Sequence, residues 1–224
     1  MVLYWLVMEI VFKRVADRVS LDFHNTASWA GDDVVGDEAL KSFSDIALWC
    51  REAGLLEATQ SDDLVKAALD HPVHAEEVVV EARRIRGTIR LLFGAVADDC
   101  PVPAAAVESL NGMLARLPLR LRSDKGDGPF EWDWQVDSEH IDGILWPVIW
   151  DAATLLRDRD ALQRVKSCAG ARCGWLFLDT SRRGNRRWCD MADCGNRAKV
   201  RRFHERHGRG GRATRGDARG GAVE

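Results

Sequence analysis

The chain has 224 residues, 46% of them hydrophobic and 30% charged, which is the composition of an ordinary globular protein and not of a low-complexity one. Its formal charge of -3 hides a strong segregation of charge. From Arg164 to Glu224 there are 16 Lys and Arg against 6 Asp and Glu, a charge of +10, whereas the residues before Arg164 carry 16 basic and 29 acidic side chains, a charge of -13. An acidic part followed by a basic part predicts an anionic partner for the latter, and a solvated basic face without a partner is the alternative.

The N-terminus, from Met1 to Phe12, is unusually apolar. It is too short to span a bilayer, Glu9 interrupts it, and it lacks the basic start and small-residue cleavage site of a secretory signal. We therefore expect no membrane partner and a cytoplasmic location. The stretch itself is predicted to be an edge strand or an extension that adds nothing to the fold.

The hydrophobic pattern of the next 150 or so residues predicts one strand and a set of helices. Apolar residues from Val19 to Phe23 alternate with polar ones, a period of two that indicates a half-buried strand within Val15–Thr26. Apolar residues at three- and four-residue steps predict helices over Glu38–Ala53, Ser61–Leu69, His74–Ala97, Pro103–Leu117 and Ser138–Arg157. We expect Ser61 to cap its helix, and Pro147 to kink or divide the last one.

The segment Leu119–Val136 returns to a period of two on both sides of a turn-forming run, Lys125–Gly128, and this predicts a β-hairpin. Residues 1–163 are therefore predicted to form one domain, in which several helices pack on a small antiparallel sheet. The expected fold class is α+β, with a mainly helical N-terminal domain.

Four of the six cysteines form two pairs of equal spacing, Cys168-x4-Cys173 and Cys189-x4-Cys194, with fifteen residues between the pairs. Two such pairs are typical of a four-cysteine zinc site, and metal fits better than disulfides in a chain without an evident export signal. A fully protein-ligated ion has no open position for substrate or water. We predict one structural Zn2+ per chain, which supplies folding energy of order 10 kcal/mol to a segment with few apolar residues.

The residues around these cysteines predict a knuckle, a hairpin and a helix. A turn at Arg183–Asn185 is expected to close the hairpin, and a helix is expected to begin at Cys194 and to end at Gly208. This treble-clef-like arrangement defines a C-terminal zinc finger over residues 164–207. Residues 208–224 form a Gly/Arg tail with almost no large apolar side chain, so we predict that they are disordered.

Cys194–Arg197 (CGNR), with the preceding runs Arg186–Met191 and Phe177–Arg182, resembles the CGNR zinc finger. Leu21–Thr26 (LDFHNT) resembles the opening motif of the ABATE domain, which accompanies that finger in proposed stress-induced bacterial transcription regulators. The resemblance implies a treble-clef finger for DNA binding and an α+β N-terminal domain that binds a ligand. It does not identify the ligand.

Basic side chains lie where a nucleic-acid contact needs them, around the predicted turn and along the predicted helix, whose N-terminus can also accept a phosphate. The candidate contacts are Arg182, Arg183, Arg186, Arg187, Asn196, Arg197, Lys199, Arg201 and Arg202. Asn196 can equally hydrogen-bond within the knuckle. Trp175 and Trp188 are expected to form the small core of the finger and not to stack on bases.

The sequence therefore predicts a zinc-containing, DNA-binding transcription regulator whose N-terminal domain senses a small molecule or mediates association, as a homodimer for instance. An RNA-binding or protein-docking treble-clef module is the alternative. We do not expect an enzyme, because the sequence has no nucleophile elbow, phosphate loop or His-x-x-x-His pair. Asp22, His24 and Asn25, near the end of the predicted strand, are the candidate lining of a ligand pocket.

Overall fold

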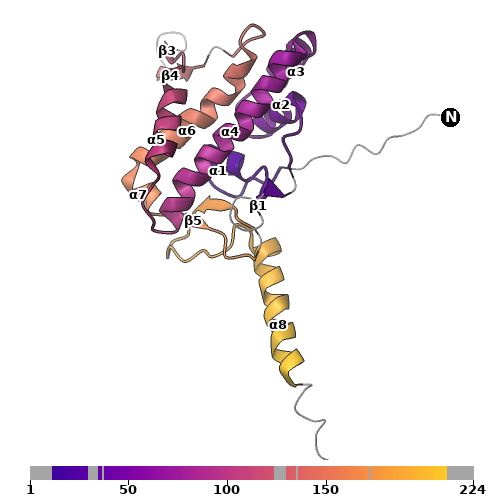
Figure 1. The fold of residues 1–224 in the computed structure, drawn as a ribbon, viewed down its shortest axis with the longest axis vertical. Coiled ribbons are helices and arrows are strands. Elements are labelled where there is room, and N and C mark those ends of the chain that lie inside the picture. Colours follow the sequence, from indigo (N-terminus) through magenta and orange to yellow (C-terminus); the bar gives the residue numbers. More distant parts are fainter. Residues whose placement is uncertain are drawn as a thin grey trace, which may run out of the picture.

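The structure is a computed structural model that describes residues 12–29, 35–36, 38–123, 130–134, 136–171 and 173–210. A helical body (residues 12–163) carries the finger (residues 164–207) at one end, and one helix projects from the finger away from the body (Figure 1). The mainly helical architecture with small antiparallel ladders confirms the expected α+β class. The apolar residues 1–11 and the tail residues 211–224 lie outside the described residues.

The body is built around α4, a helix of 26 residues whose buried face contacts α1, α2, α3 and α5. That face confirms the helix predicted over His74–Ala97. The helices of the body are α1 (Val19–His24), α2 (Phe43–Glu52), α3 (Ala58–Asp70), α4 (Pro72–Ala97), α5 (Ala104–Leu114), the 3-10 turn η1 (Ile141–Leu145), α6 (Trp146–Arg157) and α7 (Arg159–Leu162). Each of the five predicted helices is present with shifted ends.

Capping explains where two of these helices begin. The Ser42 hydroxyl accepts the Asp45 N–H and the Asp45 carboxylate accepts the Ser42 N–H, and this capping box starts α2 after Ser42. The predicted cap at Ser61 is wrong, because Glu57 and Gln60 form a capping box one turn earlier. Pro147 lies in the first turn of α6 and separates it from η1, which confirms the division expected there.

The strand predicted within Val15–Thr26 is wrong, because this segment forms α1. Its polar side chains are buried as well as its apolar ones. The Asp22 carboxylate accepts the N–H groups of Val15 and Ala16, both at 2.9 Å, and the Ser20 N–H and hydroxyl donate to Asp151 of α6 at 2.8 and 2.6 Å. Alternating polarity indicates a strand only when the polar face meets solvent, and here both faces are inside the protein.

Three two-stranded antiparallel ladders lie among the described residues, and none forms a layer under the helices. They are β1 (Ser28–Trp29) with β2 (Val35–Gly36), β3 (Arg120–Ser123) with β4 (Phe130–Asp133), and β5 (Val165–Ser167) with β6 (Leu176–Leu178). The second ladder confirms the predicted hairpin, whose turn at 125–128 lies outside the described residues.

The hairpin of the finger is the β5–β6 ladder, which encloses the first cysteine pair. The prediction of a hairpin between the two pairs is therefore wrong, although the turn at Gly184 exists, with a φ of 59° and a hydrogen bond from its N–H to the Ser181 carbonyl. The reason is that the Asn185 and Arg186 N–H groups donate to the side chains of Ser181 and Asp179 and not to a neighbouring strand.

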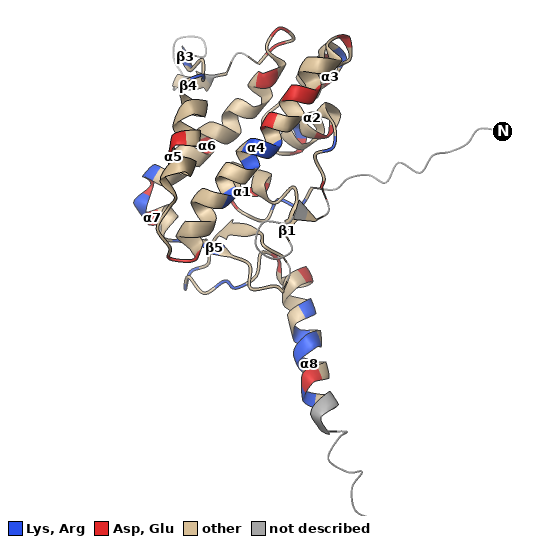
Figure 2. Ribbon diagram, in the orientation of Figure 1, with Lys and Arg blue, Asp and Glu red and all other residues tan. Residues whose placement is uncertain are grey.

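The last cysteine lies in a short π-helical turn, η2 (Met191–Gly195), which leads directly into α8 (Asn196–Gly210). This confirms the helix expected from Cys194 and extends it two residues beyond Gly208, into the predicted tail. One glycine costs a helix about 1 kcal/mol and does not by itself end it. Figure 2 shows several Lys and Arg positions along α8.

One hydrophobic core runs from the body into the finger. It joins Phe23 of α1 and Ile149 of α6 with Leu176 and Phe177 of β6 and with the four cysteines of the finger. The predicted domain boundary between residues 163 and 164 is therefore not a boundary of the core.

Candidate metal centre and nucleic-acid interface

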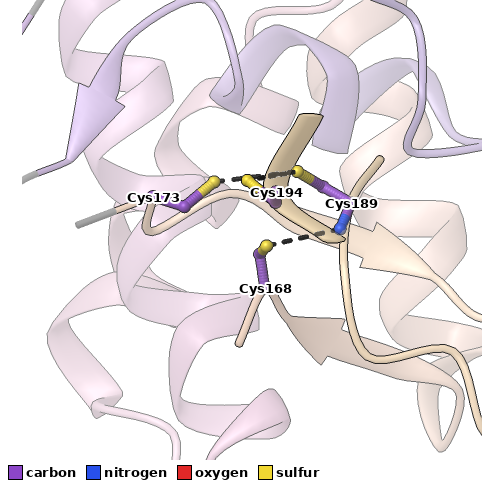
Figure 3. Close-up of side chains that lie close together, drawn as sticks. All are labelled: Cys168, Cys173, Cys189 and Cys194. Atoms are coloured by element: carbon purple, nitrogen blue, oxygen red, sulfur yellow. Dashed lines mark hydrogen bonds between the residues drawn. The ribbon is translucent and has the colours of Figure 1, made fainter. Parts of the chain in front are cut away.

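The side chains of the four cysteines of the finger lie close together (Figure 3). The Cys189 Sγ lies 3.7 Å from the Sγ atoms of Cys173 and Cys194, and the sulfurs of these three and of Cys168 all lie within 4.8 Å of one another. A tetrahedral zinc site with Zn–S bonds of about 2.3 Å has S–S edges of about 3.8 Å, whereas a disulfide requires about 2.05 Å. The donor set and its spacing fit a zinc ion and not disulfides.

The β5–β6 ladder positions the first pair, because Cys168 follows β5 and Cys173 comes just before β6. The loop between them turns tightly over the sulfurs, and a Cβ on Gly170 would lie 3.0 Å from the Cys194 Sγ. The N–H groups of Gly170 and Cys189 donate to the Cys168 Sγ at 3.4 and 3.3 Å. The nearby thiols of Cys173 and Cys189, together with these two N–H groups, lower the pKa of Cys168, which favours the thiolate that a metal requires.

Arg197 lies against the metal centre from the first turn of α8. Its Nη2 donates to the Cys194 Sγ at 3.0 Å and its Nε lies 3.4 Å from the Asp193 carboxylate. The hydrogen bond to Cys194 raises the pKa of Arg197. A Zn2+ ion bound by four thiolates would have a net charge of -2, which this guanidinium would partly compensate beside the Cys194 ligand.

The C-terminal end of α1 holds the finger on the body. The Asn25 side chain donates to the Leu176 carbonyl at 2.8 Å and accepts the Leu176 N–H at 3.0 Å. The His24 Nε2 lies 3.2 Å from the Gly174 carbonyl. The side chains of His24, the last residue of α1, and of Asn25, which follows it, are both buried. These bonds give β6 a partner on the side away from β5.

A second contact joins β1 to the first cysteine pair. The Trp29 N–H donates to the Cys173 carbonyl at 3.4 Å, and the Trp175 indole N–H donates to the Ala27 carbonyl at 2.9 Å. Gly174 has a φ of 63°, and a Cβ at this position would lie 2.3 Å from the Cβ of Trp29. Only glycine fits here, because a side chain would be strained and would also collide with the body.

Two protein families match this architecture. The CGNR zinc finger matches residues 164–207, and the ABATE family, whose description is "Putative stress-induced transcription regulator", matches residues 17–159, more than half of the chain. The chain belongs to the ABATE family. The order of the two matches confirms the ABATE domain and CGNR finger expected from the sequence, and no curated protein matches the chain.

The ABATE family connects this architecture with regulation, and the four sulfurs give the CGNR finger a place for zinc. No helix in the described part of the chain is long and apolar enough to cross a membrane.

Arg186 of the CGNR finger, a predicted nucleic-acid contact, holds the finger to the start of the ABATE body. It is half-buried over the ring of Phe177, 4.4 Å from the ring centroid. Its Nη2 donates to the carbonyls of Val15 and Cys189, and its Nη1 lies 3.2 Å from the Asp17 carboxylate. These contacts hold the guanidinium at the junction between the finger and the body.

Two further predicted contacts, Asn196 and Arg197, also make internal bonds. The Asn196 amide donates to the Ala192 carbonyl at 2.9 Å, which is the role within the knuckle that the sequence left open. Arg197 is bonded to Cys194 as described above. Both side chains are nevertheless exposed, so a nucleic-acid contact by Asn196 and Arg197 stays a prediction beside these bonds.

Six further predicted contacts of the CGNR finger are exposed cations. They lie in the loop before Cys189 and along α8, two parts of the finger where Figure 2 shows Lys and Arg positions. They are Arg182, Arg183, Arg187, Lys199, Arg201 and Arg202. The guanidinium groups of Arg187 and Arg202 lie 5.2 and 5.9 Å from the ring centroid of Trp188, which supports the prediction that this half-buried ring packs within the finger. We call these six exposed cations, two of which meet at Trp188, the basic surface of the finger.

Asp179 organises the loop that carries part of this surface, a role the sequence analysis missed. Its buried carboxylate accepts the Lys166 ammonium at 2.6 Å, the Ser181 N–H at 3.0 Å and the Arg186 N–H at 2.9 Å. Burial raises the pKa of Asp179, but these hydrogen bonds outweigh burial and hold the pKa well below its usual range. The signal in the sequence is an acidic residue directly after a strand and before Thr-Ser, which is typical of a side chain that caps a turn.

Asp22, His24 and Asn25 lie buried in the ABATE body. Asp22 binds the backbone before α1, and His24 and Asn25 hold the CGNR finger. A role for the three in ligand binding stays a prediction, and the contacts that the structure shows are structural.

Replacing Arg197 with alanine is expected to lower zinc affinity by about 10- to 100-fold, because ligand-orienting partners have effects of this size. Competition with a chromophoric chelator measures the affinity. Arg201→Ala, an exposed arginine on the same helix, is the matched control and should leave zinc affinity unchanged. Equal affinities for the two variants would show that Arg197 does not support the metal site.

His24 should make stability depend on pH. Burial lowers its pKa to about 3, despite its bond to the Gly174 carbonyl, whereas an unfolded histidine titrates near 6.5. As pH falls from about 6.5 toward 3, only the unfolded chain binds this proton, so the free energy of unfolding decreases by about 1.4 kcal/mol per pH unit. The contribution is fully present above pH 6.5.

Urea unfolding of His24→Gln with excess zinc tests this expectation. Between about pH 6.5 and pH 5.5 the variant should lose about 1 kcal/mol less than the wild type. His71→Gln, at an exposed histidine, should behave as the wild type. The same pH dependence in all three proteins would contradict the role of His24.

Proposed function

We propose that this ABATE protein is a transcription regulator that binds DNA through the basic surface of its CGNR finger, while the ABATE domain senses a small ligand or mediates association. The observation that carries the proposal is a set of exposed cations on a finger whose four clustered cysteines lie against the body. Presentation on a folded frame lowers the entropic cost of binding a phosphate backbone.

Three cations of the basic surface have no partner among the described residues and are available to another molecule. Arg182, Arg183 and Lys199 are exposed, and their side chains form no hydrogen bond or ion pair with any other residue that the structure describes. The body, in contrast, belongs to the acidic part of the chain, with its charge of -13 before Arg164. A polyanion is therefore attracted to the finger and repelled by the body, which favours one orientation of binding.

The projecting helix α8 has the dimensions of a groove-binding element. Its 15 residues correspond to about 22 Å, and a B-DNA major groove is about 12 Å wide. Val200 and Phe203 are exposed on the same helix, more than half of each side chain being accessible. Apolar side chains of this kind contact thymine methyl groups, while the neighbouring cations contact phosphates.

A mobility-shift titration over salt tests the proposal with duplex DNA and the zinc-loaded protein. If the six exposed cations contact phosphates, log K should fall against log salt with a slope of up to about -5. The double variant Arg182→Glu and Arg183→Glu should bind about 10-fold more weakly or worse and should reduce the slope by about 2. Arg51→Glu, at an exposed position of the body, is the control and should change binding less than about twofold.

Binding that is absent at low salt, or independent of salt, would overturn the proposal. The alternative functions give other outcomes of the same assay. Structured RNA that outcompetes duplex DNA would indicate an RNA-binding module. A protein partner whose binding survives the double charge reversal would indicate a docking module.

We also propose a cytoplasmic, non-enzymatic protein that regulates as a homodimer. A second copy would double the phosphate contacts and match the two-fold symmetry of paired half-sites. Light scattering of the free protein and of the DNA complex measures this, and one chain per DNA site would exclude the dimer.

A further inference from the structure

The body contains a cavity of about 260 Å3 between α4, α5, η1 and α6. Its floor is apolar and is formed by the buried side chains of Val78, Ile85, Met113, Leu145, Trp146 and Ile149. A cavity with such a floor between packed helices is the kind of place where proteins bind small molecules. A dry, apolar cavity of about 150 Å3 holds a benzene molecule, so this one has room for an aromatic ring with a short chain.

The rim of the cavity is acidic. It is formed by Glu77, Glu81 and Asp142 with one cation, Arg116, and with His74. The charge of Glu81 is compensated, because Arg116 donates to its carboxylate at 3.1 Å.

Arg84 makes two further bonds to the same carboxylate, at 2.6 and 2.7 Å. Glu77 and Asp142, in contrast, are exposed and form no hydrogen bond or ion pair with any other described residue. The mouth of an apolar cavity therefore carries two carboxylates that have no ion-pair partner among the described residues.

We propose that this cavity binds a small hydrophobic amine in its protonated form. The apolar part of the ligand occupies the floor, and its ammonium group lies at the mouth between Glu77 and Asp142. An anionic ligand of the same shape is repelled by both carboxylates, and a neutral one gains only the apolar contacts. The inference rests on the ligand-sensing part of the proposed function and supplies its site and chemical class.

The cavity is connected to the finger through α6 and α1. Ile149 lines the cavity, and two residues further along α6 Asp151 accepts the N–H and hydroxyl of Ser20 on α1. The other end of α1 carries Asn25, whose amide group pairs with Leu176 of the finger. A ligand that moves α6 thus acts on the element that holds the finger.

Calorimetric titration of the zinc-loaded, full-length protein with three probes of matched shape tests the proposal. The probes are 2-phenylethylamine, 2-phenylethanol and 3-phenylpropanoate, which are cationic, neutral and anionic at neutral pH. We expect the amine to bind with a Kd of about 1 mM or below, at least about 10-fold more tightly than the acid, with the alcohol in between. No binding of any probe, or equal binding of amine and acid, would overturn the proposal.

Two sets of variants locate the site. The double variant Glu77→Gln and Asp142→Asn changes exposed residues only, so it should fold normally, bind the alcohol unchanged and bind the amine no better than the alcohol. Glu76→Gln, an exposed neighbour outside the cavity, should bind the amine as the wild type does. Met113→Trp should fill the cavity and abolish binding of all three probes while the helical circular dichroism is retained.

An amine preference that persists in the double variant would also overturn the proposal. None of these titrations contains DNA. A protein that binds the amine but fails the mobility-shift assay therefore refutes DNA binding alone, and the reverse result refutes the amine site alone.

Discussion

Replacing Cys189 with serine is expected to release zinc, unfold the finger and destabilise the body with it. Structural zinc contributes of order 10 kcal/mol to small zinc domains, which is far more than the few apolar residues of the finger supply. Because Leu176 and Phe177 belong to the core of the body, their exposure removes about 3 to 6 kcal/mol of burial from the body as well. The melting temperature of the helical signal should therefore fall by about 10 °C or more.

The measurement combines metal analysis with thermal unfolding followed by circular dichroism. Cys100→Ser is the matched control, since Cys100 is exposed and lies outside the cluster, and it should keep one zinc per chain and the wild-type melting temperature. Chelation of the wild-type protein should reproduce the effect of Cys189→Ser. A body that melts at an unchanged temperature after zinc is lost would show that the two parts fold independently.

The sequence predicts the metal centre well because ligand spacing is local chemistry. The chain must bring both cysteines of each pair, Cys168 with Cys173 and Cys189 with Cys194, to one ion within five residues. The helix after the last cysteine is predicted by its own apolar and basic pattern. The long helices of the body are predictable for the same reason, since their periodicity is contained within each segment.

The errors at α1 and at Arg186 share one cause, which is contact between segments far apart in the chain. The polar residues of α1 are buried because Asp151 lies about 130 residues away and accepts Ser20, and no local pattern reveals that partner. Arg186 reads as one basic residue among several, and only the fold brings Val15 and Asp17 to it across about 170 residues. The local sequence shows which residues are charged, but tertiary contacts determine which of these side chains remain available to a partner.

Replacing Gly174 with alanine is expected to weaken the contact between the finger and the body more than a glycine-to-alanine replacement elsewhere in the finger. The position combines a φ of 63° with a Cβ that would lie 2.3 Å from the Cβ of Trp29. The left-handed conformation costs about 1 to 2 kcal/mol and the collision about 1 to 3 kcal/mol, so the free energy of unfolding should fall by about 2 to 5 kcal/mol. Urea unfolding followed by circular dichroism measures it.

Gly184→Ala separates the two contributions. Gly184 has nearly the same φ, 59°, but a Cβ there would have no atom within 4 Å, so this variant should lose only the conformational cost of about 1 to 2 kcal/mol. The difference between the two variants is then the cost of the collision between the added methyl group and Trp29. If both variants lose the same amount, the finger yields to the methyl group without cost, which would contradict a tight junction at Trp29. A larger loss for Gly174→Ala, together with weaker DNA binding at unchanged zinc content, would show that DNA binding requires a finger fixed on the body and not the finger alone.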